Sequence, residues 1–430
     1  MNRRSPDTRL RVAVLAHLRH PIRAPFAGGV EAHTWHLARG LAARGHTVTL
    51  YASGDSATGV ALFPVVDEHY ERRLPWADHH EGDVLRRHLD AAYERAWDAI
   101  EAGDHDVVHN NTLHPLPIER ARARGVPMLT ALHVPPFARL AHAVAGPAVP
   151  QLHFCVTSRR QDAVWRGVGR RDDPTGGDGR LDGTDHDDSR RDGVRRPATR
   201  APRHPPVEPH VVANGIDPDV WPFRAAGDGS AIWAGRITPT KGTHLAIDAA
   251  RRAGIALSIV GKIEDRSYFE RQVAPGLSDT IRHLGHVEGD ALAKLFGRAS
   301  VLLFTPRWEE PFGLVAIEAM ACGLPVAYVD RGAAREVVGE AGSGSEGEDG
   351  GALAAAIERA LDVPREVPRR RVESRFTLDG MLDGYERLYH DCIDGVESAR
   401  TGSVAVERPS LRADRSAATC PAPEARVVCP

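Results

Sequence analysis

Short apolar runs alternate with helical patterns over two long stretches of the chain, one on either side of a polar central segment. The helical patterns include residues 29–44, 84–100 and 242–253. The runs that we expect to form strands are residues 10–18, 47–52, 106–109, 128–133 and 154–157 in the first stretch and residues 231–234, 256–261, 283–287, 301–305 and 325–330 in the second. Continuous apolar strands separated by helices are typical of parallel sheets with both faces covered. Each stretch is therefore predicted to form a doubly wound α/β domain.

The pattern stops at two places, which set the predicted domain limits. Residues 166–209 are rich in Asp, Arg, Gly and Pro, so they are predicted to form a disordered linker. A salt-bridged helix is the alternative there, and the scattered glycines disfavour it. Residues 397–430 have no periodicity and are predicted to be a disordered tail. We therefore expect domains at residues 10–165 and 210–375, followed by a helix at 376–396 that packs back toward the first domain.

The composition excludes several classes of protein. Apolar residues make up 42% of the 430 residues and charged residues 26%, which is ample for two cores. The formal net charge of −3 removes the positive field of a dedicated nucleic-acid-binding protein. Five cysteines without a CxxC pair, and no secretory signal, favour a reducing, cytoplasmic compartment. No run approaches the roughly 20 apolar residues of a membrane span, although peripheral contact with the inner face of the membrane stays compatible.

Two cations follow the first apolar run of the second domain. Arg236 and Lys241 are five residues apart, are bracketed by glycines, and lie where a strand passes into a helix. Arg offers planar bidentate contacts and Lys a point charge, a pair that suits a diphosphate. A solvated basic loop is the alternative interpretation. The segment is not a Walker A loop, because GxxxxGK[ST] is absent.

A carboxylate pair follows the apolar run at residues 301–305. A helix is expected between Pro311 and Gly323, which places Glu318 on an apolar element. A carboxylate there is costly without a partner, so a ligand role is favoured over an exposed strip of the helix. Glu310 and Glu318 would lie about 12 Å apart if the whole segment were helical, too far for the carboxylate pair of a retaining glycosidase. They are predicted to contact opposite ends of one elongated ligand.

Two backbone features add candidate anion sites. The helix start around Phe312, Gly313 and Leu314 presents a positive dipole suited to a phosphate group. Gly28 and Gly29 directly precede the first helical pattern, where the backbone can approach a ligand closely. A simple strand-to-helix turn explains the two glycines equally well.

The ordered set of motifs resembles a known family. Gly28-Gly29, Asn214-Gly215-Ile216-Asp217, the loop from Arg236 to Lys241, and the Glu-x7-Glu pair are similar to those of retaining glycosyltransferases of family 4. The similarity covers residues 10–157 and 211–330 and the last helix, near 376–393. It implies the GT-B fold, with two Rossmann-like domains facing across a cleft, the first binding the acceptor and the second the donor.

The resemblance also implies roles in the second domain. Arg236 and Lys241 match the pair that binds the donor diphosphate and stabilises its charge as it leaves. Glu318 matches the residue that holds the ribose hydroxyls, and Glu310 the one that contacts the donor sugar near the reacting carbon. The backbone near Val287 matches the segment that cradles the base.

Further positions complete the implied donor site. The amides of Phe312, Gly313 and Leu314 match contacts to the sugar and phosphate. His133 matches a histidine of the first domain that touches the donor sugar, and the loop with Gly28 and Gly29 matches one that lies close to the diphosphate.

The implied function is transfer of a sugar from a nucleotide sugar to a hydroxyl acceptor with retention of configuration. The acceptor would be a saccharide, a lipid-linked molecule or a small molecule, with no nucleic acid involved. We expect no cofactor and no metal, because Arg236 and Lys241 supply the positive charge. A GT-B phosphorylase or epimerase, or a non-catalytic nucleotide-sugar binding protein, are the alternatives.

Overall fold

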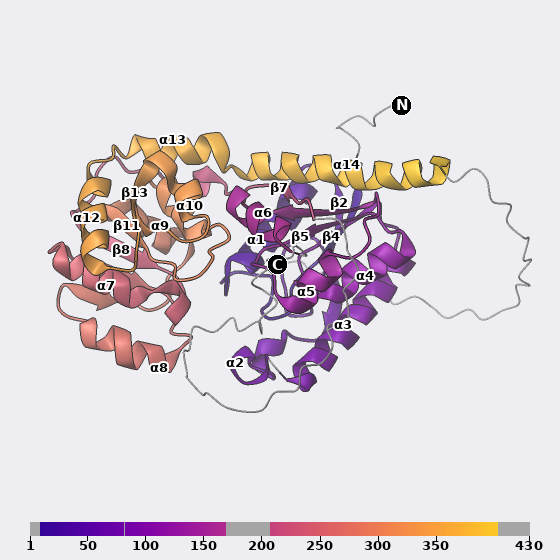
Figure 1. Cartoon of the computed structure of the whole chain (residues 1–430), viewed down its shortest axis with the longest axis horizontal. Helices are drawn as coiled ribbons and strands as arrows, with labels where there is room; N and C mark the ends of the chain where they lie inside the picture. The colour runs from indigo at the N-terminus through magenta and orange to yellow at the C-terminus, as the bar shows by residue number, and fades with distance from the viewer. Residues whose placement is uncertain (1–8, 81, 169–206, 403–430) are drawn as a thin grey trace, which may run out of the picture. The chain divides into compact units, whose positions relative to one another are not determined.

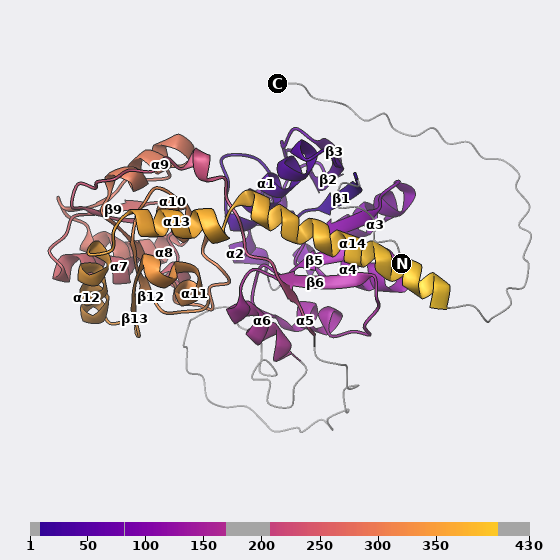
Figure 2. The same cartoon turned by 90° about the horizontal axis from the view of Figure 1, so that it is seen from above.

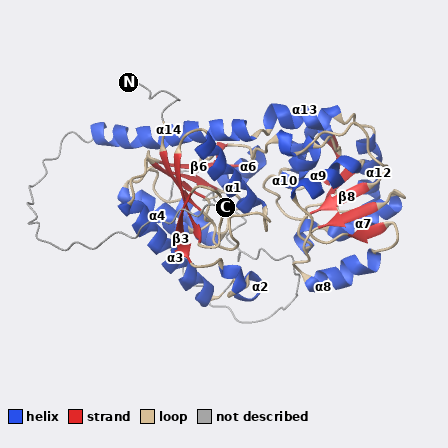
Figure 3. Ribbon diagram, turned by 180° about the vertical axis from the view of Figure 1, so that it is seen from behind, coloured by secondary structure: helices blue, strands red, loops and turns tan. Residues whose placement is uncertain are grey.

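Two parallel sheets organise the chain. The structure is a computed structural model that describes residues 9–80, 82–168 and 207–402, with side chains to residue 396. The first sheet has the strand order β3-β2-β1-β4-β5-β6-β7 and the second the order β10-β9-β8-β11-β12-β13 (Figures 1 and 3). In each sheet the order reverses direction beside the first strand, so the predicted doubly wound α/β architecture is confirmed.

The elements of the first sheet follow the apolar runs closely. Its strands are β1 (Arg11–Leu15), β2 (Thr47–Ser53), β3 (Ala61–Val66), β4 (Val107–Asn110), β5 (Met128–Ala131), β6 (Leu152–Val156) and β7 (His210–Val211). The helices between them are α1 (Gly29–Ala43), α2 (Trp76–His79), α3 (Asp83–Ala102), α4 (Pro115–Arg124), α5 (Ala138–Val144) and α6 (Arg159–Arg166). The apolar stripe of α3 is buried, with Tyr93 and Trp97 each 1% exposed, as expected for a helix packed on a sheet.

The second sheet is covered on both faces. Its strands are β8 (Ala231–Ala234), β9 (Leu257–Val260), β10 (Ile281–His283), β11 (Val301–Phe304), β12 (Val326–Val329) and β13 (Gly342–Ser345). The helices are α7 (Thr243–Arg252), α8 (Arg266–Tyr268), α9 (Gly289–Arg298), α10 (Leu314–Ala321), α11 (Ala334–Val338), α12 (Gly350–Leu361), α13 (Glu366–Arg375) and α14 (Leu378–Gly402). Successive strand residues point to opposite faces, so Trp233 packs in the core with α7 and α12, whereas Ile232 packs in the core with α9 and α10.

The chain forms two compact units whose limits differ from the predicted ones. Among the described residues, 9–131, 148–154 and 382–402 form the first unit, and 132–147, 155–168 and 207–381 form the second. Residues 132–147 and 155–165, which were expected in the first domain, therefore belong to the second unit.

Helix α14 continues into the first unit (Figure 2), and polar side chains of that unit hold it. His109 lies between Tyr389, at 2.8 Å, and Asn111, at 3.0 Å, and Arg44 pairs with Glu386. His109 is fully buried, so its ring serves to hold α14.

Several expectations need correction. The strand expected at 283–287 is β10, at Ile281–His283, and strands β3, β7 and β13 were not expected. Residues 342–345, within a Gly-rich run, form β13, which pairs with β12. Most of the predicted linker, residues 169–206, and residues 403–430 of the predicted tail lie outside the described residues. Helix α14 extends to Gly402, six residues into that tail.

None of the helices in the described part of the chain is both long enough and apolar enough to cross a bilayer.

Candidate functional site

The loop that carries Arg236 and Lys241 lies at the carboxyl end of β8 and is bonded to the end of β11. The Thr305 hydroxyl accepts a hydrogen bond from the Trp233 indole at 2.9 Å and donates to the Lys241 carbonyl at 2.8 Å. Gly242 has φ +65°, and a Cβ there would lie 2.3 Å from the Thr305 carbonyl oxygen. Only glycine fits, so the close packing of two loops fixes the backbone of Lys241.

Lys241 and Glu310, distant in sequence, form an ion pair. Lys241 Nζ lies 2.6 Å from Glu310 Oε2, and the Trp308 indole N–H donates to the same oxygen at 2.8 Å. The ammonium also lies 5.2 Å from the centre of the Trp308 ring, in a cation–π arrangement. Among the described residues nothing bonds to Oε1 of Glu310, although the residue is only 6% exposed. One carboxylate oxygen is thus fixed by two donors, and the other has no hydrogen-bond partner among the described residues.

Gly332 fixes the peptide of Glu310. It follows β12 with φ +59°, and a Cβ there would lie 2.3 Å from both the nitrogen and the carbonyl oxygen of Glu310. That carbonyl accepts a hydrogen bond from the Ala333 amide at 2.8 Å. The loop after β12 therefore fixes the position of the Glu310 backbone. Nothing in the sequence indicated this role of Gly332 beyond its position after a strand.

The start of α6 holds the residues on either side of Glu310. The hydroxyls of Thr157 and Ser158 donate to the Pro311 carbonyl at 3.1 and 2.8 Å. Arg160 binds both carboxylate oxygens of Glu309, at 2.8 and 3.0 Å. These contacts hold the loop in place on both sides of Glu310.

His133 lies two residues beyond β5 and is 8% exposed. Burial lowers its pKa to about 4, so the imidazole is neutral at pH 7. It can therefore donate or accept a hydrogen bond but carries no charge. The Gln161 side chain donates to the Val134 carbonyl at 3.0 Å, and Gln161, Pro135 and Glu310 line one cavity of about 10 Å³. The structure thus brings the His133 segment beside Glu310.

Helix α10 begins at Leu314, three residues later than expected from Pro311. Gly313 has φ +94°, which breaks the helical path, and a Cβ there would lie 2.6 Å from the Phe304 ring. Residues 310–313 are therefore not helical, so the condition for a helical spacing of about 12 Å between the two glutamates is not met. No side chain caps the start of α10, and the anion site expected around residues 312–314 stays a prediction.

Glu318 lies inside α10 without a partner. No hydrogen bond or ion pair to its carboxylate exists in the described part of the chain. Burial raises its pKa to about 7, so the group is close to half-ionised at neutral pH. An unpaired, partly buried carboxylate fits the predicted ligand role rather than a solvated strip.

Arg236 is paired with a carboxylate that the sequence did not single out. Both oxygens of Glu264 accept from Arg236 Nη1, at 2.9 and 2.7 Å, with the arginine side chain 40% exposed. The two cations expected to share one diphosphate therefore each hold a different acidic side chain.

The remaining predicted positions divide between the units. Gly28 and Gly29 lie in the first unit, where α1 begins at Gly29. Gly28 is extended, and a Cβ there would lie 3.0 Å from Glu31 Oε2, so room for that carboxylate also favours glycine. Val287 lies between β10 and α9, half-buried against the core of the second unit.

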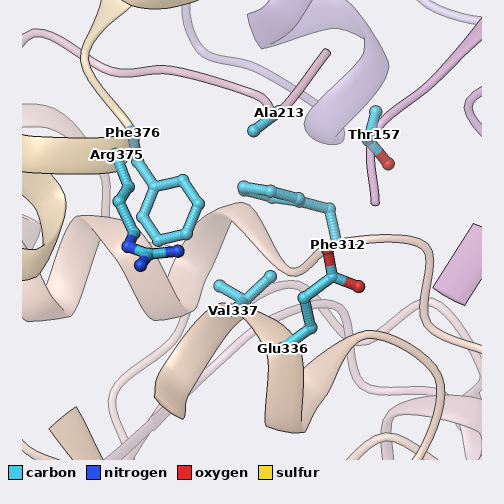
Figure 4. A pocket seen from close by; sticks show the side chains of 7 residues that line it. All are labelled: Thr157, Ala213, Phe312, Glu336, Val337, Arg375 and Phe376. Carbon is cyan, nitrogen blue, oxygen red and sulfur yellow. The ribbon is translucent and has the colours of Figure 1, made fainter. Parts of the chain in front are cut away.

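A second cavity, of about 220 Å³, lies behind Phe312 (Figure 4). The rings of Phe312 and Phe376 meet edge to face at 5.4 Å. The side chain of Phe312 is thus part of a wall, and its expected contact with a ligand is left to its backbone. The lining residues are Thr157, Ala213, Phe312, Glu336, Val337, Arg375 and Phe376.

The described residues contain no group of three or more His, Cys, Asp or Glu placed to hold a metal ion.

Comparison with known proteins identifies the family that this chain matches. The family model "Glycosyl transferases group 1" matches residues 224–375, and "Glycosyltransferase Family 4" matches residues 27–164. The chain is 28% identical to a glycogen synthase of Mycobacterium tuberculosis, over 83% of this chain and 88% of that protein. It is 29% identical to a D-inositol 3-phosphate glycosyltransferase of Acidothermus cellulolyticus, over 93% and 94%.

Solved structures share the fold. The catalytic domain of starch synthase IV from Arabidopsis thaliana, bound to ADP and acarbose, has a TM-score of 0.62 at 14% identity, covering 90% of this chain and all of that one. The Anabaena protein HepE, in complex with UDP and glucose, has a TM-score of 0.60 at 16% identity, covering 88% and 98%. With matching models in both halves and the doubly wound sheets of the GT-B fold, the chain belongs to the group 1 glycosyltransferases of family 4.

Proposed function

We propose that this protein transfers a glycosyl group from a nucleoside-diphosphate sugar to a hydroxyl acceptor, with retention of anomeric configuration. The observation that carries the proposal is the Lys241–Glu310–Trp308 cluster, in which one carboxylate oxygen is fixed and the other is left for a ligand. The Anabaena structure in complex with UDP and glucose and the Arabidopsis structure bound to ADP and acarbose support a nucleotide sugar as the donor.

Each polar group has a task in donor binding. Glu318 accepts hydrogen bonds from the ribose hydroxyls, and ribose supplies the donors that its carboxylate lacks. Arg236, Lys241 and the amide groups at the start of α10 bind the diphosphate. Oε1 of Glu310 accepts from a hydroxyl of the donor sugar, and neutral His133 adds a hydrogen bond without adding charge.

The reaction follows from where charge develops. The bond between the anomeric carbon and the phosphate oxygen breaks, and its electron pair goes to the diphosphate. Fixed cations and the dipole of α10 stabilise that negative charge. The acceptor oxygen attacks from the same face, and its proton passes to the departing phosphate oxygen. Retention then needs no protein nucleophile.

The first unit is assigned the acceptor. The names of two relatives, which specify inositol phosphate and glycogen, favour a polyhydroxylated acceptor. Cys155, Cys322 and Cys392 are buried and form no disulfide, which is compatible with a reducing compartment, and we assign the reaction to the cytoplasm.

The test begins with a thermal-shift screen of UDP-, GDP- and ADP-sugars, because a ligand at 100-fold its Kd stabilises by about 2.7 kcal/mol. The donor identified is then incubated with candidate polyols and the new linkage is assigned by NMR. Transfer with the donor's anomeric configuration, reduced at least 100-fold by Glu310→Ala, is expected. Inversion would overturn retention, equal activity of the wild type and Glu310→Ala would overturn the catalytic assignment, and donor binding without any transfer would indicate a binding protein. Phosphate-dependent cleavage or an isomerised donor would instead indicate a phosphorylase or an epimerase.

A further inference from the structure

Both cations of the donor loop are already occupied by carboxylates. Lys241 holds Glu310 at 2.6 Å, and Arg236 holds Glu264 at 2.7 and 2.9 Å. Under the proposed function Glu310 has a second task on the donor sugar. Glu264 has no such task, and its pairing with Arg236 needs another explanation.

The backbone, rather than chance, places Glu264 beside Arg236. Ile237 and Ile263 pair as a short parallel bridge, so the residues after β8 and after β9 run side by side. The Ile237 amide donates to the Lys262 carbonyl at 2.9 Å, and the Asp265 amide donates to the Ile237 carbonyl at 3.1 Å. Glu264 is thereby held next to the guanidinium by hydrogen bonds on both sides.

The pair occupies only part of the guanidinium. Both Glu264 oxygens bond to Nη1, while Nε and Nη2 of Arg236 bond to nothing in the described part of the chain. An incoming phosphate oxygen can therefore bind the open edge before the carboxylate leaves. The exchange proceeds without a fully uncompensated arginine, and like charges then push Glu264 and the phosphate apart.

We propose that Glu264 is a positioning residue that holds Arg236 in the donor-free enzyme and competes with the diphosphate for it. The inference rests on the proposed function, in which Arg236 binds the diphosphate. Donor binding exchanges a carboxylate for a phosphate, and after transfer Glu264 returns to Arg236 and speeds the release of the nucleoside diphosphate. The residue thus weakens product binding in favour of turnover.

The experiment measures binding of the bare diphosphate by titration calorimetry. The probe is whichever of UDP, GDP or ADP shifts the melting temperature of the wild type most. The variants are Glu264→Gln and the matched control Glu270→Gln, which removes a carboxylate from the exposed Arg266 pair on the same unit. Because Glu264 is partly exposed, we expect Glu264→Gln to bind the probe about fivefold more tightly and to be inhibited by it at about fivefold lower concentration. Glu270→Gln should stay within twofold of the wild type.

A double-mutant cycle separates competition from a general charge effect. In an Arg236→Gln background, Glu264→Gln should change the affinity less than twofold, because the contested cation is gone. Unchanged or weaker binding by Glu264→Gln, or the same gain in both backgrounds, would overturn the inference while leaving the proposed function intact. If none of the three diphosphates or their sugars binds the wild type, the proposed function falls, and this inference with it.

Discussion

The indole of Trp308 determines which oxygen of Glu310 is free. Its N–H and Lys241 Nζ both bind Oε2, at 2.8 and 2.6 Å. Under the proposed function Lys241 also binds the diphosphate, and the indole would then keep the carboxylate oriented. A hydrogen bond to a charged group contributes about 1.5–3 kcal/mol, so its loss should be measurable in turnover.

Trp308→Phe keeps an aromatic face for Lys241 but removes the donor. We expect kcat for glycosyl transfer to fall at least tenfold, with affinity for the bare nucleoside diphosphate within twofold of the wild type. Trp35→Phe, which removes an indole bond to a carbonyl in the first unit, is the control and should leave both quantities unchanged. Equal losses of turnover and diphosphate affinity would show that Trp308 only maintains the fold.

Glu318 gives the protein a pH-dependent stability with a definite sign. Its pKa is about 7 in the folded chain and 4.5 ordinarily, so the folded state binds more protons between these values. The free energy of unfolding therefore falls as pH rises from about 4.5 to 7. Glu318→Gln should be more stable than the wild type at pH 8 by about 2 kcal/mol, with a much smaller difference at pH 4.

Urea unfolding at the two pH values checks this prediction. Glu358→Gln, at an exposed position of α12, is the control. If the stability difference between Glu318→Gln and the wild type does not change with pH, Glu318 does not carry a raised pKa.

At the scale of elements, the loop after β12 determines where the loop after β11 lies. Gly332→Ala would place a methyl group 2.3 Å from the Glu310 backbone in addition to straining a residue with φ +59°. Gly254→Ala has the same left-handed backbone, φ +65°, with nothing within 4 Å. Strain alone costs about 1–2 kcal/mol, and both variants should show it in their melting temperatures. Only Gly332→Ala should also lower turnover, by at least tenfold, and equal turnover in the two variants would contradict this role.

The predicted elements were most accurate where apolar residues form continuous runs. β1, β8 and β11 fall inside such runs because their side chains are buried on both faces of a sheet. β13, Gly342–Ser345, could not be found this way, because its residues carry almost no side chain and it is defined by pairing with β12. The late start of α10 likewise depends on the ring of Phe304 beneath Gly313, a contact that local sequence does not encode.

The residues of the candidate site could be predicted from the sequence, but the ion pairs between them could not. The motifs identified Lys241, Glu310 and Arg236, yet the ion pair across 69 positions and the pairing of Arg236 with Glu264 depend on how the sheet orders its strands. The sequence pattern indicates which residues end a strand. Only the fold indicates which strand ends are neighbours.

At the scale of the whole molecule, the strand order brings two cationic side chains and the start of a helix together in a chain whose net charge is −3. β8 and β11 are neighbours, so the loop with Arg236 and Lys241 and the start of α10 gather at the carboxyl edge of one sheet. A nucleoside diphosphate leaving group carries charge that such an arrangement can stabilise without a divalent cation.

Glycosyl transfer is therefore predicted to be metal-independent. Pretreatment with EDTA, followed by assay with and without added Mg²⁺ or Mn²⁺, should change kcat less than twofold. Lys241→Ala should lose at least 100-fold, because the lost ammonium leaves developing charge uncompensated in a water-poor site. Loss of activity in EDTA that Mn²⁺ restores would contradict this prediction, because the protein cations would then be insufficient. Lys241→Ala would in that case be expected to respond to added metal.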